Sequence, residues 1–230
     1  MSKPIISVII PAFNEENGIG QVLDEIPKEW VTEIIVVNNA STDSTEKIAR
    51  GCGATVLREP ISGYGRACLK GIDYLAKSSP QPQIVVFLDA DHSDYPEEMI
   101  ELVTPIMDNK ADLVIGSRVL GKKESGSMTL QQIFGNWLAT RLMLWFYGVK
   151  FTDLGPFRAI RFSSLLDLHM QDKTYGWTVE MQLKAAKQKI RCLEVPVRYR
   201  KRIGFSKISG TLKGTIMAGY KILYTLFKYL

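Results

Sequence analysis

Runs of consecutive valine, isoleucine and leucine residues alternate with helix-like segments along the first half of this chain. A strand that is apolar on both faces must be covered on both sides, so such runs are typical of parallel sheets between layers of helices. The pattern predicts an α/β fold with a mostly parallel, Rossmann-like sheet flanked by helices. Strands are expected at residues 5–10, 33–37, 54–57, 84–88 and 112–116, and helices at 17–26, 41–51, 65–76 and 96–107.

The second half of the chain has a less regular pattern, with no repeat and no evident linker. We therefore expect a single domain, residues 1–230, made of a first half (1–118), a second half (119–207) and a C-terminal amphipathic helix (208–230). Further helices are expected at 128–151, 163–170 and 178–188, and further strands at 157–160 and 191–197.

Composition narrows the class of protein. The chain has 230 residues, of which 46% are hydrophobic, enough to bury a substantial core. Three scattered cysteines and two histidines argue against a disulfide framework or a zinc site and fit a reducing cytosol. We find no signal peptide and no apolar run long enough to span a membrane.

Two carboxylates follow the most apolar of the expected strands. Asp89 and Asp91 come directly after Val85–Leu88, and residues two apart at a strand end point to the same side. Paired carboxylates repel each other unless a cation lies between them, and Mg²⁺ or Mn²⁺ commonly shares such ligands with phosphates. The spacing favours a metal-bridged phosphate site, with two ordinary surface aspartates as the alternative.

Polar motifs also follow the other expected strands. A Gly-x-Gly turn opens the helix that contains Gly65 and Arg66, and a helix N-terminus of this kind attracts anions. Ser41 is expected to cap the helix that follows it. His92 is a candidate phosphate contact, and Glu180 is left open between a cleft residue and a surface residue.

These motifs, taken in order, resemble a known family. The segments that carry the resemblance are Pro11–Glu15, Asn38–Asp43, Gly63–Ala67, Asp89–Asp91, Gly116–Arg118, Asn136, Asp153–Arg158, Glu194–Pro196 and Gly204–Lys207. They are similar to family 2 glycosyltransferases, inverting enzymes with the GT-A fold, and most closely to the dolichyl- or polyprenyl-phosphate mannose and glucose synthases. The sequence departs from the family where Asn38 and Asn39 replace aspartates and where Ser93 replaces a glutamine.

The resemblance implies a role for specific residues of this chain. It implies that a nucleotide-sugar donor is bound by Pro11, Asn14, Glu15, Asn39, Gly65, Arg66, Asp89, Ala90 and Asp91. It implies a divalent cation, Mg²⁺ or Mn²⁺, on Asp89 and Asp91, and catalysis by Asp91, Asp153 and Arg118. Acceptor or phosphate contacts are implied for Arg118, Arg158, Arg202 and Lys207.

The charge distribution bears on the acceptor. Residues 184–230 carry 12 lysines and arginines against the single Glu194, whereas the rest of the chain is net acidic. This favours a polyprenyl phosphate, which is largely dianionic at neutral pH and needs no strong base. A sugar hydroxyl acceptor is the alternative, and it would make Asp153 an essential base.

The last helix indicates where the protein works. Its apolar stripe, flanked by Lys213, Lys221 and Lys228, suits an anionic membrane surface, but the same stripe could dock on the protein's own core. We expect a cytoplasmic protein, peripheral to the inner face of the membrane, that binds no nucleic acid. A non-catalytic membrane scaffold is the remaining alternative, and no oligomeric state is predicted.

Overall fold

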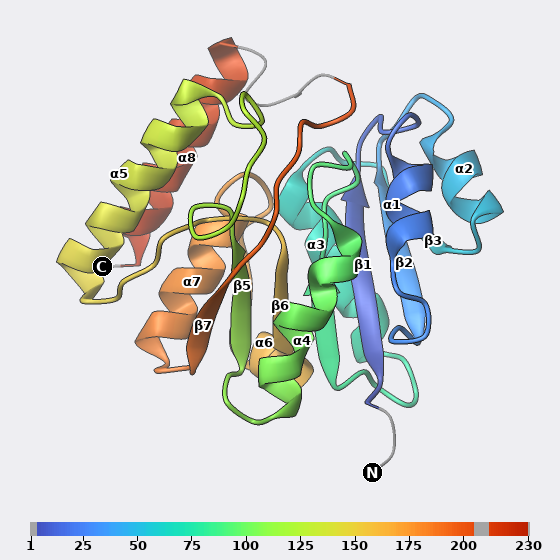
Figure 1. Ribbon diagram of the computed structural model, residues 1–230, viewed down its shortest axis with the longest axis horizontal. Helices are drawn as coiled ribbons and strands as arrows, with labels where there is room; N and C mark the ends of the chain where they lie inside the picture. The colour runs from blue at the N-terminus through green and yellow to red at the C-terminus, as the bar shows by residue number, and fades with distance from the viewer. Residues whose placement is uncertain (1–3, 205–211, 230) are drawn as a thin grey trace.

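The computed structural model describes residues 4–204 and 212–229, which form one seven-stranded sheet between two layers of helices (Figure 1). The sheet order is β3-β2-β1-β4-β6-β5-β7. The strands are β1 (Ile6–Ala12), β2 (Glu33–Asn39), β3 (Thr55–Glu59), β4 (Ile84–Phe87), β5 (Leu113–Ser117), β6 (Arg158–Arg161) and β7 (Cys192–Pro196). The sheet therefore takes strands from both sides of residue 118, and the predicted mostly parallel α/β fold is confirmed.

One strand runs against the others. β6 lies between β4 and β5 and is antiparallel to both, with Ala159 opposite Val86 on one side and Val114 on the other. The remaining strand pairs are parallel. The sequence predicts the position of this short strand but not its direction, because a run of four residues carries no signal for orientation.

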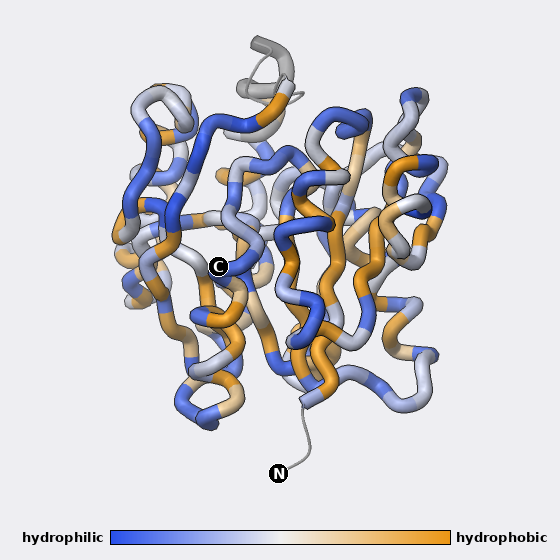
Figure 2. The backbone as a smooth tube through the Cα atoms, turned by 45° about the vertical axis from the view of Figure 1, so that its right-hand side comes forward, coloured by the Kyte–Doolittle hydropathy of each residue, from blue (hydrophilic) through white to orange (hydrophobic). Residues whose placement is uncertain are grey.

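The alternation of side chains along each strand divides the interior into two cores. Ile9 of β1 and Phe87 of β4 face one core, whereas Val8 and Val86 face the other. Burial of both faces is what the continuous apolar runs require. Figure 2 shows the hydrophobic strands enclosed by more hydrophilic loops.

The helices cover both cores. The first core packs under α3 (Tyr64–Ala76), α6 (Phe162–Asp167) and α7 (Trp177–Lys187). The second packs under α1 (Ile19–Glu25), α2 (Thr45–Gly51) and α4 (Met99–Met107), with a 3-10 turn at Pro96–Glu98 before α4. Two further helices, α5 (Leu130–Tyr147) and α8 (Leu212–Lys228), lie side by side at one end of the sheet, next to α7 (Figure 1).

Helices α2 and α5 begin later than predicted. The helix expected from residue 41 begins at Thr45, and Ser41 does not cap it: its hydroxyl accepts from the Asn14 amide at 3.0 Å. The Asp43 carboxylate accepts from the Thr45 amide instead. The long helix α5 starts at a reciprocal capping box of Thr129 and Gln132, which satisfies two otherwise unpaired amides.

The C-terminal helix α8 docks on the protein with one face and exposes another. Leu226 is fully buried, whereas Tyr220, Tyr224 and Phe227 are exposed. Lys221, expected to face the membrane, pairs with Asp172 at 3.0 Å. Part of the apolar stripe thus covers the core, and its aromatic side chains are exposed to solvent. The side chain of Lys213 lies outside the described part of the structure.

The start of α3 packs directly on the segment before α7. A side chain at Gly65 would place its Cβ 2.0 Å from the carbonyl oxygen of Asp172. The Gly65 and Arg66 amides donate to the carbonyls of Thr174 and Lys173. These amides are therefore already bonded, and the prediction that the helix N-terminus binds an anion is not supported there.

Replacing Gly65 tests this packing. We expect Gly65→Ala to lower the free energy of unfolding by about 2 kcal/mol, because the new methyl group overpacks a backbone contact. Thermal unfolding should show a fall in Tm of roughly 4–8 °C for a chain of this size. The matched control is Gly51→Ala, where a Cβ meets nothing within 4 Å; an equal loss in both variants would contradict the packing explanation.

Candidate functional site

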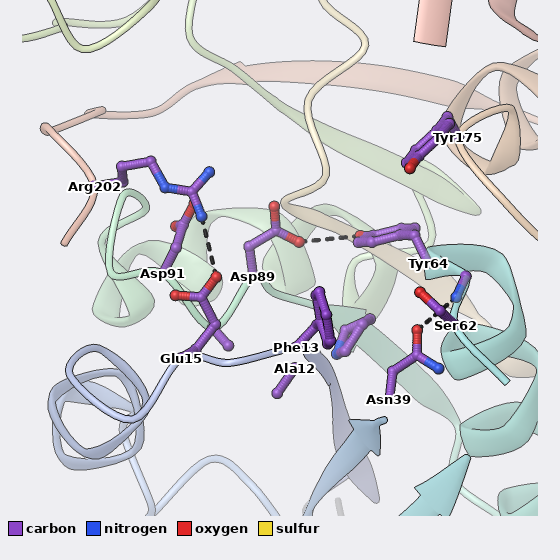
Figure 3. Close-up of a pocket in the computed structure, with 13 residues that line it drawn as sticks. Ala12, Phe13, Glu15, Asn39, Ser62, Tyr64, Asp89, Asp91, Tyr175 and Arg202 are labelled. Atoms are coloured by element: carbon purple, nitrogen blue, oxygen red, sulfur yellow. Dashed lines mark hydrogen bonds and ion pairs between the residues drawn. The ribbon is translucent and has the colours of Figure 1, made fainter. Parts of the chain in front are cut away.

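The carboxyl ends of β1, β2 and β4 enclose a cavity of about 210 Å³. Parallel strands of open α/β sheets place ligand sites at this edge. Figure 3 shows the side chains around it. The lining residues are Pro11, Ala12, Phe13, Glu15, Asn39, Ser62, Gly63, Tyr64, Asp89, Ala90, Asp91, Tyr175 and Arg202.

The two aspartates after β4 lie together in this cavity. Asp89 accepts a hydrogen bond from the Tyr64 hydroxyl at 3.1 Å. Asp91 accepts from the amide and hydroxyl of Ser93 and pairs with Arg202 at 3.2 Å. Burial, followed by the charge of Asp91, raises the pKa of Asp89 to about 7. A cation bound between the two carboxylates would therefore reduce the repulsion between them.

The loop after β1 forms the opposite side of the cavity. The Glu15 carboxylate pairs with Arg202 at 3.1 Å, and its amide donates to the Thr45 hydroxyl. Asn14 has a positive φ of 54° and does not line the cavity. Its side-chain oxygen accepts from the Thr42 amide at 2.8 Å, so it holds the loop in place.

Asn39, predicted to contact the nucleotide, supports the cavity wall. Its side-chain nitrogen donates to the carbonyls of Glu59 and Ile61, and its oxygen accepts from the Gly63 amide at 2.7 Å. Those bonds use both hydrogens of the amide. Gly65 and Arg66 do not line the cavity.

A second cavity, of about 560 Å³, adjoins the first and has mainly apolar walls. It shares Tyr64, Asp89, Asp91, Tyr175 and Arg202 with the first cavity. Its far side is formed by α5 and α8, with Phe134, Leu138, Ala139, Ile222 and Leu223 among the lining residues. The first cavity, the more polar of the two, thus meets the apolar one at the paired aspartates.

Arg118 and Asp153 form a buried ion pair beside the second cavity. The guanidinium donates to both carboxylate oxygens at 2.7 and 2.8 Å, and the Arg118 amide donates to the same group at 2.7 Å. Arg118 also lies over the Tyr199 ring, 5.0 Å from its centroid, and lines the cavity. Asp153 is fully buried and does not line it.

Comparison with known proteins identifies the family. The model of glycosyl transferase family 2 matches residues 7–168. An uncharacterized glycosyltransferase of Mycobacterium tuberculosis is 36% identical over 222 residues, covering 95% of this chain and 96% of that protein. The chain is a family 2 glycosyltransferase.

Two archaeal relatives carry more specific names. A dolichyl-phosphate hexose transferase of Haloferax volcanii is 30% identical over 206 residues, covering 88% of this chain and 86% of that protein. A UDP-N-acetylglucosamine–dolichyl-phosphate N-acetylglucosaminyltransferase of Methanococcus voltae is 28% identical, covering 98% and 96%. Among solved structures, glucosyl-3-phosphoglycerate synthase of Mycobacterium tuberculosis with Mn²⁺, UDP and glucosyl-3-phosphoglycerate has a TM-score of 0.74. It is 23% identical, covering 98% of this chain and 80% of that chain, and this likeness shows the GT-A fold.

The residues of this glycosyltransferase fit a divalent cation. Asp89 and Asp91 offer hard oxygen ligands, and burial together with the charge of Asp91 raises the pKa of Asp89. Over residues 4–204 and 212–229, no group of three or more His, Cys, Asp or Glu side chains is arranged to hold a metal. The two aspartates would therefore leave positions on the ion for diphosphate oxygens and water. Ser93, which replaces a glutamine, hydrogen-bonds Asp91.

One predicted phosphate contact of the glycosyltransferase is not brought to either cavity. Arg158 is fully buried and donates to the carbonyls of Leu154, Gly155 and Thr178. Burial lowers the pKa of its guanidinium to about 10. It holds neighbouring backbone in place and lines neither cavity, so the predicted phosphate contact of Arg158 is corrected. Lys207 lies outside the described residues.

His92 and Glu180 line neither cavity. His92 pairs with Glu25 at 2.8 Å, outside the cavities. Glu180 is fully buried, accepts from the amides of Gln171 and Asp172, and is bonded by the Tyr229 hydroxyl. The candidate phosphate contact of His92 is thus not supported, and Glu180 fixes the segment before α7 and the end of α8.

Three tyrosines that line the cavities were not among the predicted site residues. Tyr64 and Tyr175 line both, and Tyr199 lines the apolar one. The position of Tyr64 inside the Gly-x-Gly turn was a usable signal. Tyr175 and Tyr199 reach the site through tertiary packing, which leaves no local pattern in the sequence.

Asp94 is a buried carboxyl group without a hydrogen-bond partner. Both of its oxygens are buried and unpaired, close to the charges of Asp89, Asp91 and Arg118. Burial and the two aspartates raise the pKa of Asp94 well above its usual value. The native carboxyl group therefore holds its proton at pH values where the unfolded chain has lost it.

This shift predicts how stability depends on pH. The contribution of Asp94 to the free energy of unfolding falls as pH rises above the ordinary value of 3.8. Asp94→Asn, a neutral isostere, should gain stability over the wild type by at most about 1.4 kcal/mol per pH unit. Denaturant unfolding in EDTA between pH 5 and pH 8 measures the difference. Asp24→Asn, at an exposed site, is the control; a gain that does not grow with pH would refute the assignment.

Proposed function

We propose that this glycosyltransferase moves a hexose, with inversion, from a UDP- or GDP-linked sugar to a polyprenyl phosphate, with the help of Mg²⁺ or Mn²⁺. The observation that carries the proposal is the union of a polar and an apolar cavity at Asp89 and Asp91. The polar cavity is of a kind that takes a nucleotide diphosphate. The apolar cavity, closed by α5 and α8, suits the first part of a lipid chain.

On the donor side, Asp89 and Asp91 would hold the cation against the diphosphate. A bound divalent cation neutralises the charge that develops on the leaving diphosphate. Tyr64 fixes one oxygen of Asp89, and Ser93 fixes one oxygen of Asp91, so the pair is held ready for the ion. Arg202 adds a positive charge at the junction of the cavities.

On the acceptor side, the geometry favours a nucleophile that is already ionised. Asp153 is bonded through both oxygens to Arg118 and lies away from the cavity, so it is not placed to take a proton. Among the described residues that line the apolar cavity, the carboxylates are Asp89 and Asp91, which the cation would occupy. A lipid monophosphate is largely dianionic at neutral pH and needs no base. Arg118 is in place to orient it.

The named relatives and structural neighbours differ in their acceptors. The two archaeal relatives are named for dolichyl phosphate. Two solved structures of glucosyl-3-phosphoglycerate synthase contain instead UDP with glucosyl-3-phosphoglycerate and UDP-glucose with phosphoglyceric acid. The apolar walls of the second cavity support the lipid. The alternative, a sugar hydroxyl acceptor, would need a general base. Among the described residues that line this cavity, the only carboxylates are Asp89 and Asp91.

We further propose that the enzyme works at the cytoplasmic membrane surface, held by α5 and α8. The described helices include none that is long and apolar enough to cross a bilayer. Leu130, Phe134, Trp137 and Trp145 of α5 are nevertheless 81%, 61%, 52% and 78% exposed. Phe227 of α8 extends this surface and packs on Phe146. Aromatic side chains of this kind favour the interface of a bilayer, and the apolar cavity ends between these same helices.

The acceptor proposal is tested by transfer to lipids. Radiolabelled sugar from UDP- and GDP-linked donors should be transferred to a polyprenyl phosphate and not to the matching polyprenol. Asp91→Asn should lower transfer at least roughly a hundredfold, since it weakens the cation site without removing volume. Asp73→Asn, on the exposed face of α3, should behave as wild type. Equal transfer to phosphate and alcohol, or full activity in EDTA, would contradict the proposal.

The membrane proposal is tested by sedimentation with liposomes. Trp145→Ser should weaken binding roughly tenfold at any salt concentration, because it removes apolar burial. Lys228→Gln should weaken binding about fivefold at low salt and less at high salt, because it removes charge. Met107→Ser, at an exposed apolar site on α4, is the control. Unchanged binding of the Trp145 variant would show that this face does not meet the bilayer.

A further inference from the structure

The segment from Arg198 to Gly204 runs across the donor site and is fixed to the loop that carries the aspartates. The Ile203 amide donates to the Asp91 carbonyl, and the Arg200 amide donates to the Ser93 carbonyl, both at 2.9 Å. Arg202 lies between these two bonded residues, and the bonds hold it beside Asp91 of the aspartate pair (Figure 3).

Arg202 is the arginine of this segment that reaches the carboxylates of the cavity. One terminal nitrogen lies 3.1 Å from a Glu15 oxygen and 3.2 Å from an Asp91 oxygen. Its neighbours bind elsewhere: Arg200 pairs with Glu25, and Arg198 pairs with Glu97 and Glu98. Among the described residues, Arg202 alone forms an ion pair with Asp91.

The guanidinium is incompletely satisfied in this position. Its Nε is buried and has no hydrogen-bond partner. A buried unpaired donor on a charged group costs free energy that a better-placed acceptor would recover. The guanidinium of Arg202 thus occupies Asp91, the carboxylate that would bind a metal ion, and its Nε donor remains unused.

We propose that Arg202 takes the place of the cation in the empty donor site and is displaced when the metal arrives with a diphosphate. The inference rests on the proposed function. A metal ion alone must compete with the guanidinium for Asp91. A diphosphate offers the displaced guanidinium new acceptor oxygens, so the two ligands favour each other's binding. Arg202 is then a positioning residue that couples metal binding to donor binding.

The test is Mn²⁺ binding in the absence of nucleotide, followed by the electron paramagnetic resonance signal of the free ion. Arg202→Gln should bind Mn²⁺ about fivefold more tightly than the wild type, within the usual range of coupling between sites. Arg202→Lys keeps the charge and should gain less. Arg198→Gln removes a charge from the same segment without touching Asp91 and should stay within about twofold of the wild type.

Repeating the titration with UDP or GDP separates this inference from the proposed function. The gain in Mn²⁺ affinity on adding the nucleotide should be smaller in Arg202→Gln than in the wild type. Unchanged or weaker binding of Mn²⁺ alone by Arg202→Gln, or an equal gain in Arg198→Gln, overturns the inference and leaves the function standing. A wild type that binds Mn²⁺ neither alone nor with UDP or GDP contradicts both.

Discussion

The repulsion between Asp89 and Asp91 is the constraint on which the site depends. β4 delivers both carboxylates to a buried edge of the sheet, where burial and proximity raise the pKa of Asp89 to about 7. Neighbouring groups are arranged around that charge: Tyr64 and Ser93 donate hydrogen bonds to it, and Arg202 pairs with it. Burying two such carboxylates lowers the free energy of unfolding, and the binding of a cation offsets that loss.

Much of the fold and part of the site could be predicted from the sequence. Continuous apolar runs fix a parallel sheet, and its carboxyl edge is where such sheets bind ligands, so Asp89 and Asp91 were placed correctly. The direction of β6 and the burial of Arg158 could not be predicted, because both depend on contacts between distant segments. A charged residue in a family motif looks the same in the sequence whether its side chain lines a cavity or, like that of Arg158, hydrogen-bonds neighbouring backbone.

The Arg118–Asp153 pair shows how the structure changes the chemistry inferred from sequence. Each residue alone suggests a function, one as a phosphate ligand and the other as a base. Bonded bidentately, they form one rigid unit in which the carboxylate orients the guanidinium. An orienting arginine beside an apolar cavity suits an anionic group at the head of a lipid, whereas a hydroxyl acceptor would require the carboxylate to be free.

The central claim is that the phosphate of a polyprenyl phosphate attacks the sugar. It is tested most directly with a lipid phosphate labelled with ¹⁸O in its terminal oxygens, with ³¹P nuclear magnetic resonance of the product. We expect a glycosyl phosphate lipid whose bridging oxygen to the sugar carries the label. A lipid product with an unlabelled bridge, or release of the nucleotide diphosphate without any lipid-linked sugar, would contradict it.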